Sequence, residues 1–165
     1  MQPKDYIKKF SFPSDFRAPV QFAFEDLSAR PLTRSDLKAD MEAVNSSIET
    51  IRKTRGGTWP EEEVSEEFDL LDLAWHEREF RDGGSFAYVV YDATERYIGC
   101  FYLYPMGVRT ELTEGLLDYD MDASWWVSTE AYEQGYYDKL YAALQLCLKE
   151  FPVESIYYSN KETTV

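Results

Sequence analysis

The sequence contains little histidine and little cysteine. Its 165 residues include one histidine, His76, and two cysteines, Cys100 and Cys147. No Cys-x-x-Cys pair or cysteine–histidine spacing predicts a metal site, so we expect no metal. Cys100 lies in a predicted strand and Cys147 in a predicted helix, which favours two buried free thiols. One histidine and no Gly-x-Ser-x-Gly sequence argue against a Ser-His-Asp hydrolase.

Basic charge is also scarce, since 17 Lys and Arg stand against 31 Asp and Glu, a net charge of −14. Phosphate contacts need local positive charge, and no Lys/Arg cluster supplies it, so we expect no nucleic-acid partner. The acidic excess favours a cationic amine as ligand, although solubility alone would also select it. We see no signal peptide and no apolar run near 18 residues. This predicts no membrane partner and a cytoplasmic location.

The length predicts one domain. Residues 1–21 are interrupted by three prolines and are expected to form an irregular N-terminal arm, followed by a single domain over 22–165. The arm carries Phe10, Phe12 and Phe16, which are expected to pack on the domain. The arm can cover its own subunit or a neighbour's, so a homodimer stays open.

Hydrophobic periodicity gives the order of elements after the arm. It predicts a strand at 22–31, helices at 33–55 and 62–82, a hairpin of 85–92 with 97–104, an acidic connection at 106–121, a strand at 123–128, a helix at 136–151 and a strand at 153–159. A hairpin followed by a strand–helix–strand unit implies an α+β fold with a mixed, mostly antiparallel sheet, its parallel crossover last.

The stretch from Trp125 to Tyr137 is the most informative local pattern. A strand ends here at a short loop, and a long helix is predicted to begin at Tyr136. The first N–H groups of a helix have no partner within the helix, so this position can hold an anion such as a phosphate.

Several short motifs resemble a known family in the same order along the chain. These are Arg30-Pro31-Leu32 followed by Asp36, Ile98-Gly99, Asp122 followed by Trp125-Trp126-Val127, and Asn160 after the last predicted strand. Together they resemble the GNAT acetyltransferases over roughly residues 22 to 160. The resemblance implies a GNAT-like acyl-CoA N-acyltransferase fold, with acetyl-CoA as co-substrate.

The resemblance also implies where acetyl-CoA binds. The pantetheine pairs with the backbone of the family's fourth strand, and the pyrophosphate rests on N–H groups of the next loop. The residues implied to bind the coenzyme are Trp126, Val127, Ser128, Gln134, Gly135, Tyr136 and Asn160. In the loop motif, Gly135 matches the family, whereas Tyr132 and Tyr137 replace a Gln or Arg and a small residue.

The resemblance further implies roles in catalysis. Asp122 occupies the position of the family's general base, although a solvated aspartate before a strand is the alternative. Family members continue past Asn160 with a helix that often supplies the general acid, whereas five residues follow Asn160 here. Tyr157 or Tyr158 is then the candidate acid.

Three residues are candidates for binding the substrate. Trp59 lies between the two predicted helices, and its alternative role is to anchor the loop. His76 follows Asp72 by four residues, so the two can pair on one helix face, as a base, a substrate contact or a structural pair. Tyr102 shares a strand face with Tyr104, and this face either lines the cleft or lies opposite it.

The sequence therefore predicts an acetyl-CoA-dependent N-acetyltransferase that acts directly on an amine of a small molecule or a peptide. The alternative is a non-catalytic GNAT-like domain that binds a CoA-like ligand, a peptide or a partner protein. A plain α+β domain without an acidic ligand is the third hypothesis.

Overall fold

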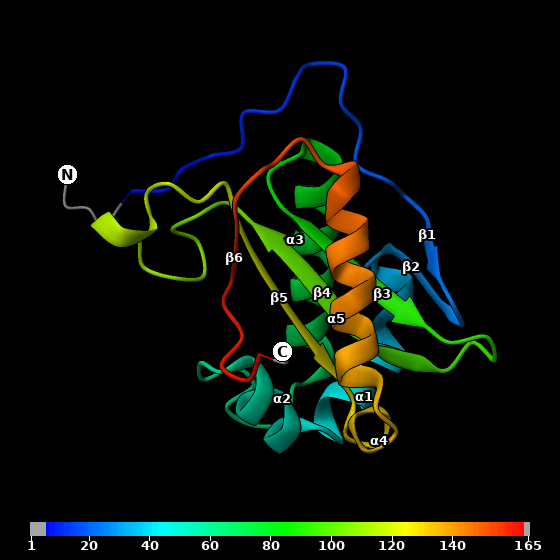
Figure 1. Ribbon diagram of the computed structural model, residues 1–165. Coiled ribbons are helices and arrows are strands. Elements are labelled where there is room, and N and C mark those ends of the chain that lie inside the picture. The colour runs from blue at the N-terminus through cyan, green and yellow to red at the C-terminus, as the bar shows by residue number, and fades with distance from the viewer. Residues whose placement is uncertain (1–5, 164–165) are drawn as a thin grey trace.

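A computed structural model describes residues 6–163 and contains one six-stranded sheet with the order β1-β2-β3-β4-β5-β6 (Figure 1). The strands are β1 (Phe22–Phe24), β2 (Leu27–Pro31), β3 (Phe86–Tyr91), β4 (Tyr97–Tyr104), β5 (Met121–Val127) and β6 (Ile156–Tyr158). Strands β1 to β5 pair antiparallel, and β6 pairs parallel to β5. The predicted mixed, mostly antiparallel sheet with its parallel crossover last is confirmed.

Helices cover both faces of this sheet. They are α1 (Leu37–Asn45), α2 (Ile48–Arg55), α3 (Glu66–Asp82), α4 (Thr129–Glu133) and α5 (Tyr136–Cys147), with short 3-10 turns at Arg34–Asp36, Glu114–Leu116 and Leu148–Glu150. Helix α5 crosses one face, here called the α5 face, and α3 lies behind the sheet with α1 and α2 below (Figure 1). We call this second side the α3 face.

Strand alternation divides the core into two clusters, one on each face of the sheet. On β5, Trp125 and Val127 point to the α5 face and pack with Leu140 and Leu144. Trp126 points to the α3 face, where it packs with Tyr102 and Leu73 among others. Because the strands are covered on both sides, their sequences are apolar almost throughout rather than alternating.

Two predicted elements are interrupted in the structure. The strand expected over 22–31 is a tight hairpin, β1 and β2, which turns at Glu25 with a φ of 52°. The helix expected over 33–55 ends at Asn45 and resumes at Ile48. Ser46 donates a hydrogen bond from its side chain to the Ala43 carbonyl, and such local bonds compete with the helical ladder.

Three other elements are shorter than predicted. The second helix begins at Glu66 rather than near residue 62, with the Ser65 hydroxyl accepting a hydrogen bond from the Phe68 N–H. The last long helix tightens into a 3-10 turn after Cys147, and the last strand is shorter than predicted. The short helix α4 was missed and lies within the predicted loop.

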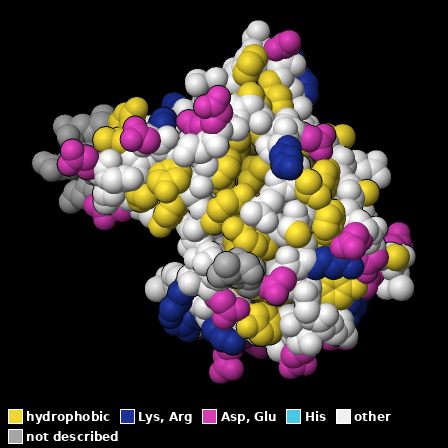
Figure 2. Space-filling view, in the orientation of Figure 1, with side chains coloured by type: hydrophobic (Ala, Val, Ile, Leu, Met, Phe, Trp, Pro, Cys, Tyr) yellow, Lys and Arg dark blue, Asp and Glu magenta, His cyan; other side chains and the backbone are white. Residues whose placement is uncertain are grey.

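The described part of the arm, residues 6–21, runs along the domain, and residues 1–5 lie outside the described residues. Phe10, Phe12 and Phe16 pack against the α5-face core, as expected. On the side seen in Figure 2, hydrophobic side chains lie along the centre and acidic side chains lie around the edge. Among residues 6–163, no helix combines the length and apolar character needed to cross a membrane.

Candidate functional site

The edge of β5 that faces β6 is closed by a side chain. Strands β5 and β6 pair only from Met121 to Ala123, and then they part. At the next position along this edge, the Trp125 N–H donates to Oδ1 of Asn160 at 3.0 Å, and Nδ2 of Asn160 donates to the Trp125 carbonyl at 2.9 Å. The same Nδ2 donates to the Tyr137 hydroxyl at 2.7 Å. The Asn160 amide thus replaces a strand partner, and its residue is only 7% exposed.

The residues that follow Asn160 tie β5 to α2 and to the start of α5. The N–H of Glu162 donates to the Thr54 carbonyl at 2.8 Å, and the N–H of Lys161 donates to the Arg55 carbonyl at 3.2 Å. The Tyr132 hydroxyl donates to the Glu162 carboxylate at 2.7 Å. Residues 160–162 therefore lie between the diverging end of β5 and the C-terminus of α2.

The segment between β5 and α5 is a short helix followed by a glycine turn. Ser128 caps α4, its hydroxyl accepting a hydrogen bond from the Ala131 N–H at 3.1 Å. Gly135 has a φ of +85°, a conformation that favours glycine, and a Cβ there would meet no atom within 4 Å. The start of α5 is therefore sterically open at Gly135.

Two side chains of this segment have partners on the protein. Glu130 lies 3.3 Å from Arg96, and the Tyr136 hydroxyl donates to Asp26 at 2.6 Å. Tyr137 is buried and stacks on Trp125, with ring centroids 5.0 Å apart. The tyrosines that replace the family's loop residues thus serve the packing of α5.

On the α3 face, the structure brings the three predicted substrate residues together. Trp59 comes from the loop after α2, His76 from α3 and Tyr102 from β4. They line one cavity of about 120 Å³, whose full lining is Arg55, Trp59, Asp72, His76, Tyr102 and Tyr104. The Trp126 indole N–H donates to the Tyr102 hydroxyl at 2.8 Å and so fixes that ring at the cavity wall.

His76 lies against Asp72, as the four-residue spacing predicts, with its Nε2 3.6 Å from an Asp72 oxygen. The histidine is only 5% exposed, and its Nδ1 has no hydrogen-bond partner in residues 6–163. Burial, together with the positive charge of Arg55, lowers the pKa of His76 to about 4. Burial raises the pKa of Asp72 to about 6. At neutral pH the imidazole is uncharged and one of its nitrogens is unpartnered.

Two arginines that were not predicted from the sequence lie here: Arg55, which is buried and lines the cavity, and Arg109, which is half-buried and contacts Arg55. Nε of Arg55 donates to the Ser124 hydroxyl at 3.2 Å, and its guanidinium lies 4.3 Å from the Tyr102 ring centroid. Arg109 donates to the Arg55 carbonyl at 2.8 Å and to the Ser159 hydroxyl at 3.1 Å. Burial and the charge of Arg55 lower the pKa of Arg109 to about 10.

Asp122, the predicted base, lies on the same face and is fully buried. Its carboxylate accepts hydrogen bonds from the Thr110 hydroxyl at 2.9 Å and the Ser159 hydroxyl at 2.5 Å. Burial raises the pKa of Asp122. Since Ser159 also accepts a bond from Arg109, Asp122 and Arg109 are linked through one hydroxyl.

The two candidate acids lie on opposite faces of the sheet. Tyr157 is in register with Asp122 and shares its face, whereas Tyr158 is in register with Ala123, which points to the α5 face. Tyr158 packs on Tyr141 there, and burial raises its pKa to about 12. Of the two, only Tyr157 lies on the side of Asp122.

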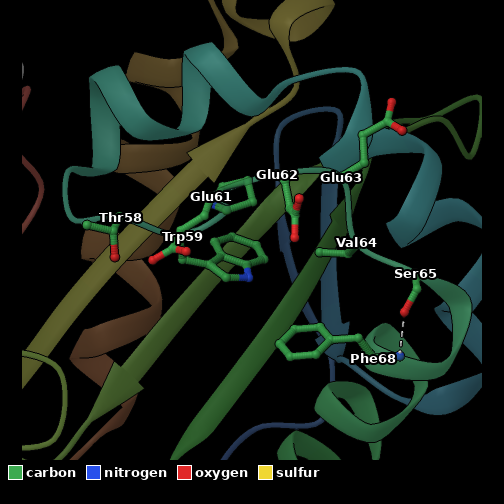
Figure 3. A pocket seen from close by; sticks show the side chains of 9 residues that line it. Thr58, Trp59, Glu61, Glu62, Glu63, Val64, Ser65 and Phe68 are labelled. Carbon is green, nitrogen blue, oxygen red and sulfur yellow. Dashed lines mark hydrogen bonds between the residues drawn. The ribbon is translucent and has the colours of Figure 1, made fainter.

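A wider hollow adjoins the cavity at Trp59 (Figure 3). Its volume is about 520 Å³, and its lining is Thr58, Trp59, Pro60, Glu61, Glu62, Glu63, Val64, Ser65 and Phe68. In Figure 3, Glu62 points toward the space between Trp59 and Phe68, and Glu63 points away. The hollow thus has apolar walls and an acidic rim.

A metal centre was also sought among the described residues. Among residues 6–163, no three His, Cys, Asp or Glu side chains are placed to hold a metal ion. Cys100 and Cys147 are both buried free thiols, as expected.

Comparisons with known proteins identify the fold. No protein-family model matches the chain, and a sequence search of curated proteins gives no match. Solved acetyltransferases do match in structure. A ribosomal-protein-S5-alanine acetyltransferase from Vibrio fischeri has a TM-score of 0.58 at 14% identity, covering 79% of this chain and 68% of its own. RimL, a ribosomal L7/L12 alpha-N-protein acetyltransferase in complex with coenzyme A, has a TM-score of 0.56 at 16% identity, covering 79% and 66%.

A mutant of the SpeG spermidine N-acetyltransferase from Vibrio cholerae also matches, with a TM-score of 0.50 at 23% identity, covering 79% and 67%. The chain spans about two thirds of the length of these proteins. The chain has the GNAT acetyltransferase fold, and the predicted fold class is confirmed.

Proposed function

We propose that this GNAT-fold protein is an N-acetyltransferase that transfers an acetyl group from acetyl-CoA directly to an amine of a small molecule or a peptide. The observation that carries the proposal is the placement of β5. This strand leads through α4 and a glycine turn into α5, and its α3 face carries the buried Asp122, which is in register with the cavity residue Tyr104. The neighbours in structure are acetyltransferases of protein N-termini and of spermidine, which supports this reading.

The chain offers acetyl-CoA a turn and a strand edge. The open space at Gly135 fits the close approach of a phosphate to the first N–H groups of α5. In this proposal the coenzyme also contacts Val127 and Ser128 at the end of the strand, and Gln134 and Tyr136 on either side of Gly135. Bound there, acetyl-CoA would supply the activated acetyl thioester. Asn160 now bonds the β5 edge at Trp125, so pantetheine pairing at that position needs the Asn160 amide to move aside.

Proton transfer is assigned to residues of the α3 face. In this proposal the amine proton passes to the Ser159 oxygen while the Ser159 proton passes to Asp122. The short contact between Ser159 and Asp122 and the raised pKa of Asp122 support this path. His76, neutral at neutral pH, is the second base candidate because it lines the cavity. Tyr157, on the same face, is the candidate acid.

The acceptor enters in this proposal from the hollow around Trp59. Its rim carries Glu61 and Glu62, and the indole forms one wall. Carboxylates and an aromatic face both attract a protonated amine, by charge and by cation–π interaction. The net charge of −14 acts in the same direction.

A second candidate function is a GNAT-fold domain that binds a ligand or partner without catalysis. The Asn160 bonds along the β5 edge and the packed Tyr132 and Tyr137 favour it, because both occupy positions that resemble coenzyme contacts.

Release of free thiol from acetyl-CoA in the presence of an amine panel separates the two functions. We expect amine-dependent release of thiol that falls at least tenfold in Asp122→Asn. Asp118 is an exposed aspartate in the connection before β5, and the control Asp118→Asn should leave the release unchanged. Binding of acetyl-CoA without amine-dependent release would establish the non-catalytic function instead. Equal turnover in Asp122→Asn and wild type would remove Asp122 as the base.

A further inference from the structure

Arg55 is a buried cation without an anionic partner. It is only 6% exposed, at the last position of α2. No carboxylate in the described range 6–163 approaches it closely enough for an ion pair. Buried charges in proteins are normally paired, because removing a charge from water is costly unless an opposite charge compensates it.

The direct contacts of Arg55 are with neutral groups. Its Nε donates to a neutral hydroxyl, that of Ser124, and its guanidinium stacks between Tyr102 at 4.3 Å and Trp59 at 5.8 Å. A second cation, the half-buried Arg109, donates a hydrogen bond to the Arg55 carbonyl. Arg55 thus brings a positive charge to the wall of a cavity whose lining contains one carboxylate, that of Asp72.

The two nearby carboxylates, those of Asp122 and Asp72, lie against other groups and make no ion pair with Arg55. Asp122 accepts hydrogen bonds at both oxygens from Thr110 and Ser159. Asp72 lies against His76. The same cavity wall holds the unpartnered Nδ1 of that buried histidine. The cavity is therefore bordered by a buried histidine with an unpartnered nitrogen and by a buried guanidinium that makes no ion pair, an arrangement that suits a polar ligand.

The size of the cavity limits that ligand. Its volume is about 120 Å³, against about 520 Å³ for the hollow around Trp59. A space of this size suits the carboxylate end of a small molecule. An arginine is suited to a carboxylate because its planar fork makes two parallel hydrogen bonds.

We propose that Arg55 is the carboxylate-binding residue of the acceptor site and that the acceptor is a small amino acid or a close analogue. This inference rests on the proposed acetyltransferase function. The acceptor carboxylate binds Arg55, and its amine lies on the side of His76 and Asp122. The acidic rim around Trp59 attracts the ammonium group, and the buried arginine then selects amines that also carry a carboxylate. Polyamines, which lack a carboxylate, are poor acceptors in this account.

Matched ligand pairs test the selection. L-Alanine, L-serine and L-threonine are compared by calorimetry with ethylamine, ethanolamine and 1-aminopropan-2-ol, which lack only the carboxylate, each with and without coenzyme A. We expect at least one amino acid to bind at least tenfold more tightly than its amine. Arg55→Met should reduce that ratio to about one, and Arg55→Lys should keep part of it.

Arg52→Met is the control, because Arg52 is exposed on the same helix, and it should leave the ratio unchanged. Equal binding within every wild-type pair, or no binding of any amino acid, overturns the inference, and this readout holds even if Arg55→Met does not fold. Acetylation of the carboxylate-free amines at the rate of the amino acids would overturn it while leaving the acetyltransferase function intact.

Discussion

Replacing Asn160 with alanine tests how the outer edge of β5 is closed. In the structure the Asn160 amide bonds both the N–H and the carbonyl of Trp125, and all three groups are buried. Alanine removes both bonds and leaves two backbone groups of a central strand without partners. Water has poor access, because residues 161–162 cover the edge through their bonds to α2.

The expected loss is large. A buried backbone group left unpaired costs about 1–3 kcal/mol, so two cost about 2–6 kcal/mol of the free energy of unfolding. For a chain of this size, a loss of 1 kcal/mol lowers the thermal midpoint by roughly 2–4 °C, so the midpoint should fall by roughly 4–24 °C. Urea unfolding followed by tryptophan fluorescence measures the loss directly, because Trp125 and Trp126 are fully buried.

Asn45 provides a matched control. Its amide makes the same pair of bonds, to the N–H and the carbonyl of Val64 at 2.8 and 3.1 Å, but its side chain is half-buried. Water can replace those bonds, so Asn45→Ala should cost about 1 kcal/mol. If Asn160→Ala is no more destabilising than Asn45→Ala, the closure of the β5 edge described above is wrong.

Three further predictions concern a buried acid, the glycine turn and the base. Burial and Asp69 raise the pKa of Asp40 well above its ordinary value, so the folded protein binds more protons than the unfolded chain. Stability therefore falls as pH rises from the unfolded pKa near ~4 through the folded value. Urea unfolding should show a smaller fall of the free energy of unfolding with pH in Asp40→Asn than in wild type. The variant should be more stable than wild type at neutral pH. A pH profile unchanged in Asp40→Asn would refute this. Gly135→Ala should cost about 1–2 kcal/mol from its left-handed backbone, because its side chain meets no atom. Gly135→Glu should fold comparably yet lose acetyl-CoA affinity, and retained affinity would show that the coenzyme binds elsewhere. Turnover should fall as pH is lowered through the pKa of the general base, and this acidic limb of the pH–rate profile should be abolished in Asp122→Asn and kept in His76→Gln. The reverse result would make His76 the base.

The order of the strands could be predicted because turn residues and aromatic runs mark them locally. The hairpin of β3 and β4 follows from two β-branched and aromatic segments around a polar turn at Asp92. The break between α1 and α2 could not, because apolar residues keep the helical spacing across Ser46 and Ser47. There, tertiary bonds decide, such as that from the Thr129 N–H to the Ser47 hydroxyl.

The candidate site was predictable in part for the same reason. Trp59, His76 and Tyr102 are rare or aromatic residues on predicted elements, and the fold brings them to one cavity. Arg55 appeared only as a basic residue at a helix C-terminus, where it is expected for the helix dipole. Arg109 lies in a connection without periodicity. Their importance arises from burial, which depends on residues distant in sequence, such as Ser124 and Ser159.

The account is tested most directly by titrating the protein with acetyl-CoA while its thermal midpoint is measured. At about a hundred times the dissociation constant, a ligand that binds only the folded state adds roughly 2.7 kcal/mol of stability. We predict a saturable rise of the midpoint that is lost in Gly135→Glu. An unchanged midpoint at millimolar acetyl-CoA would contradict the proposed acetyltransferase function.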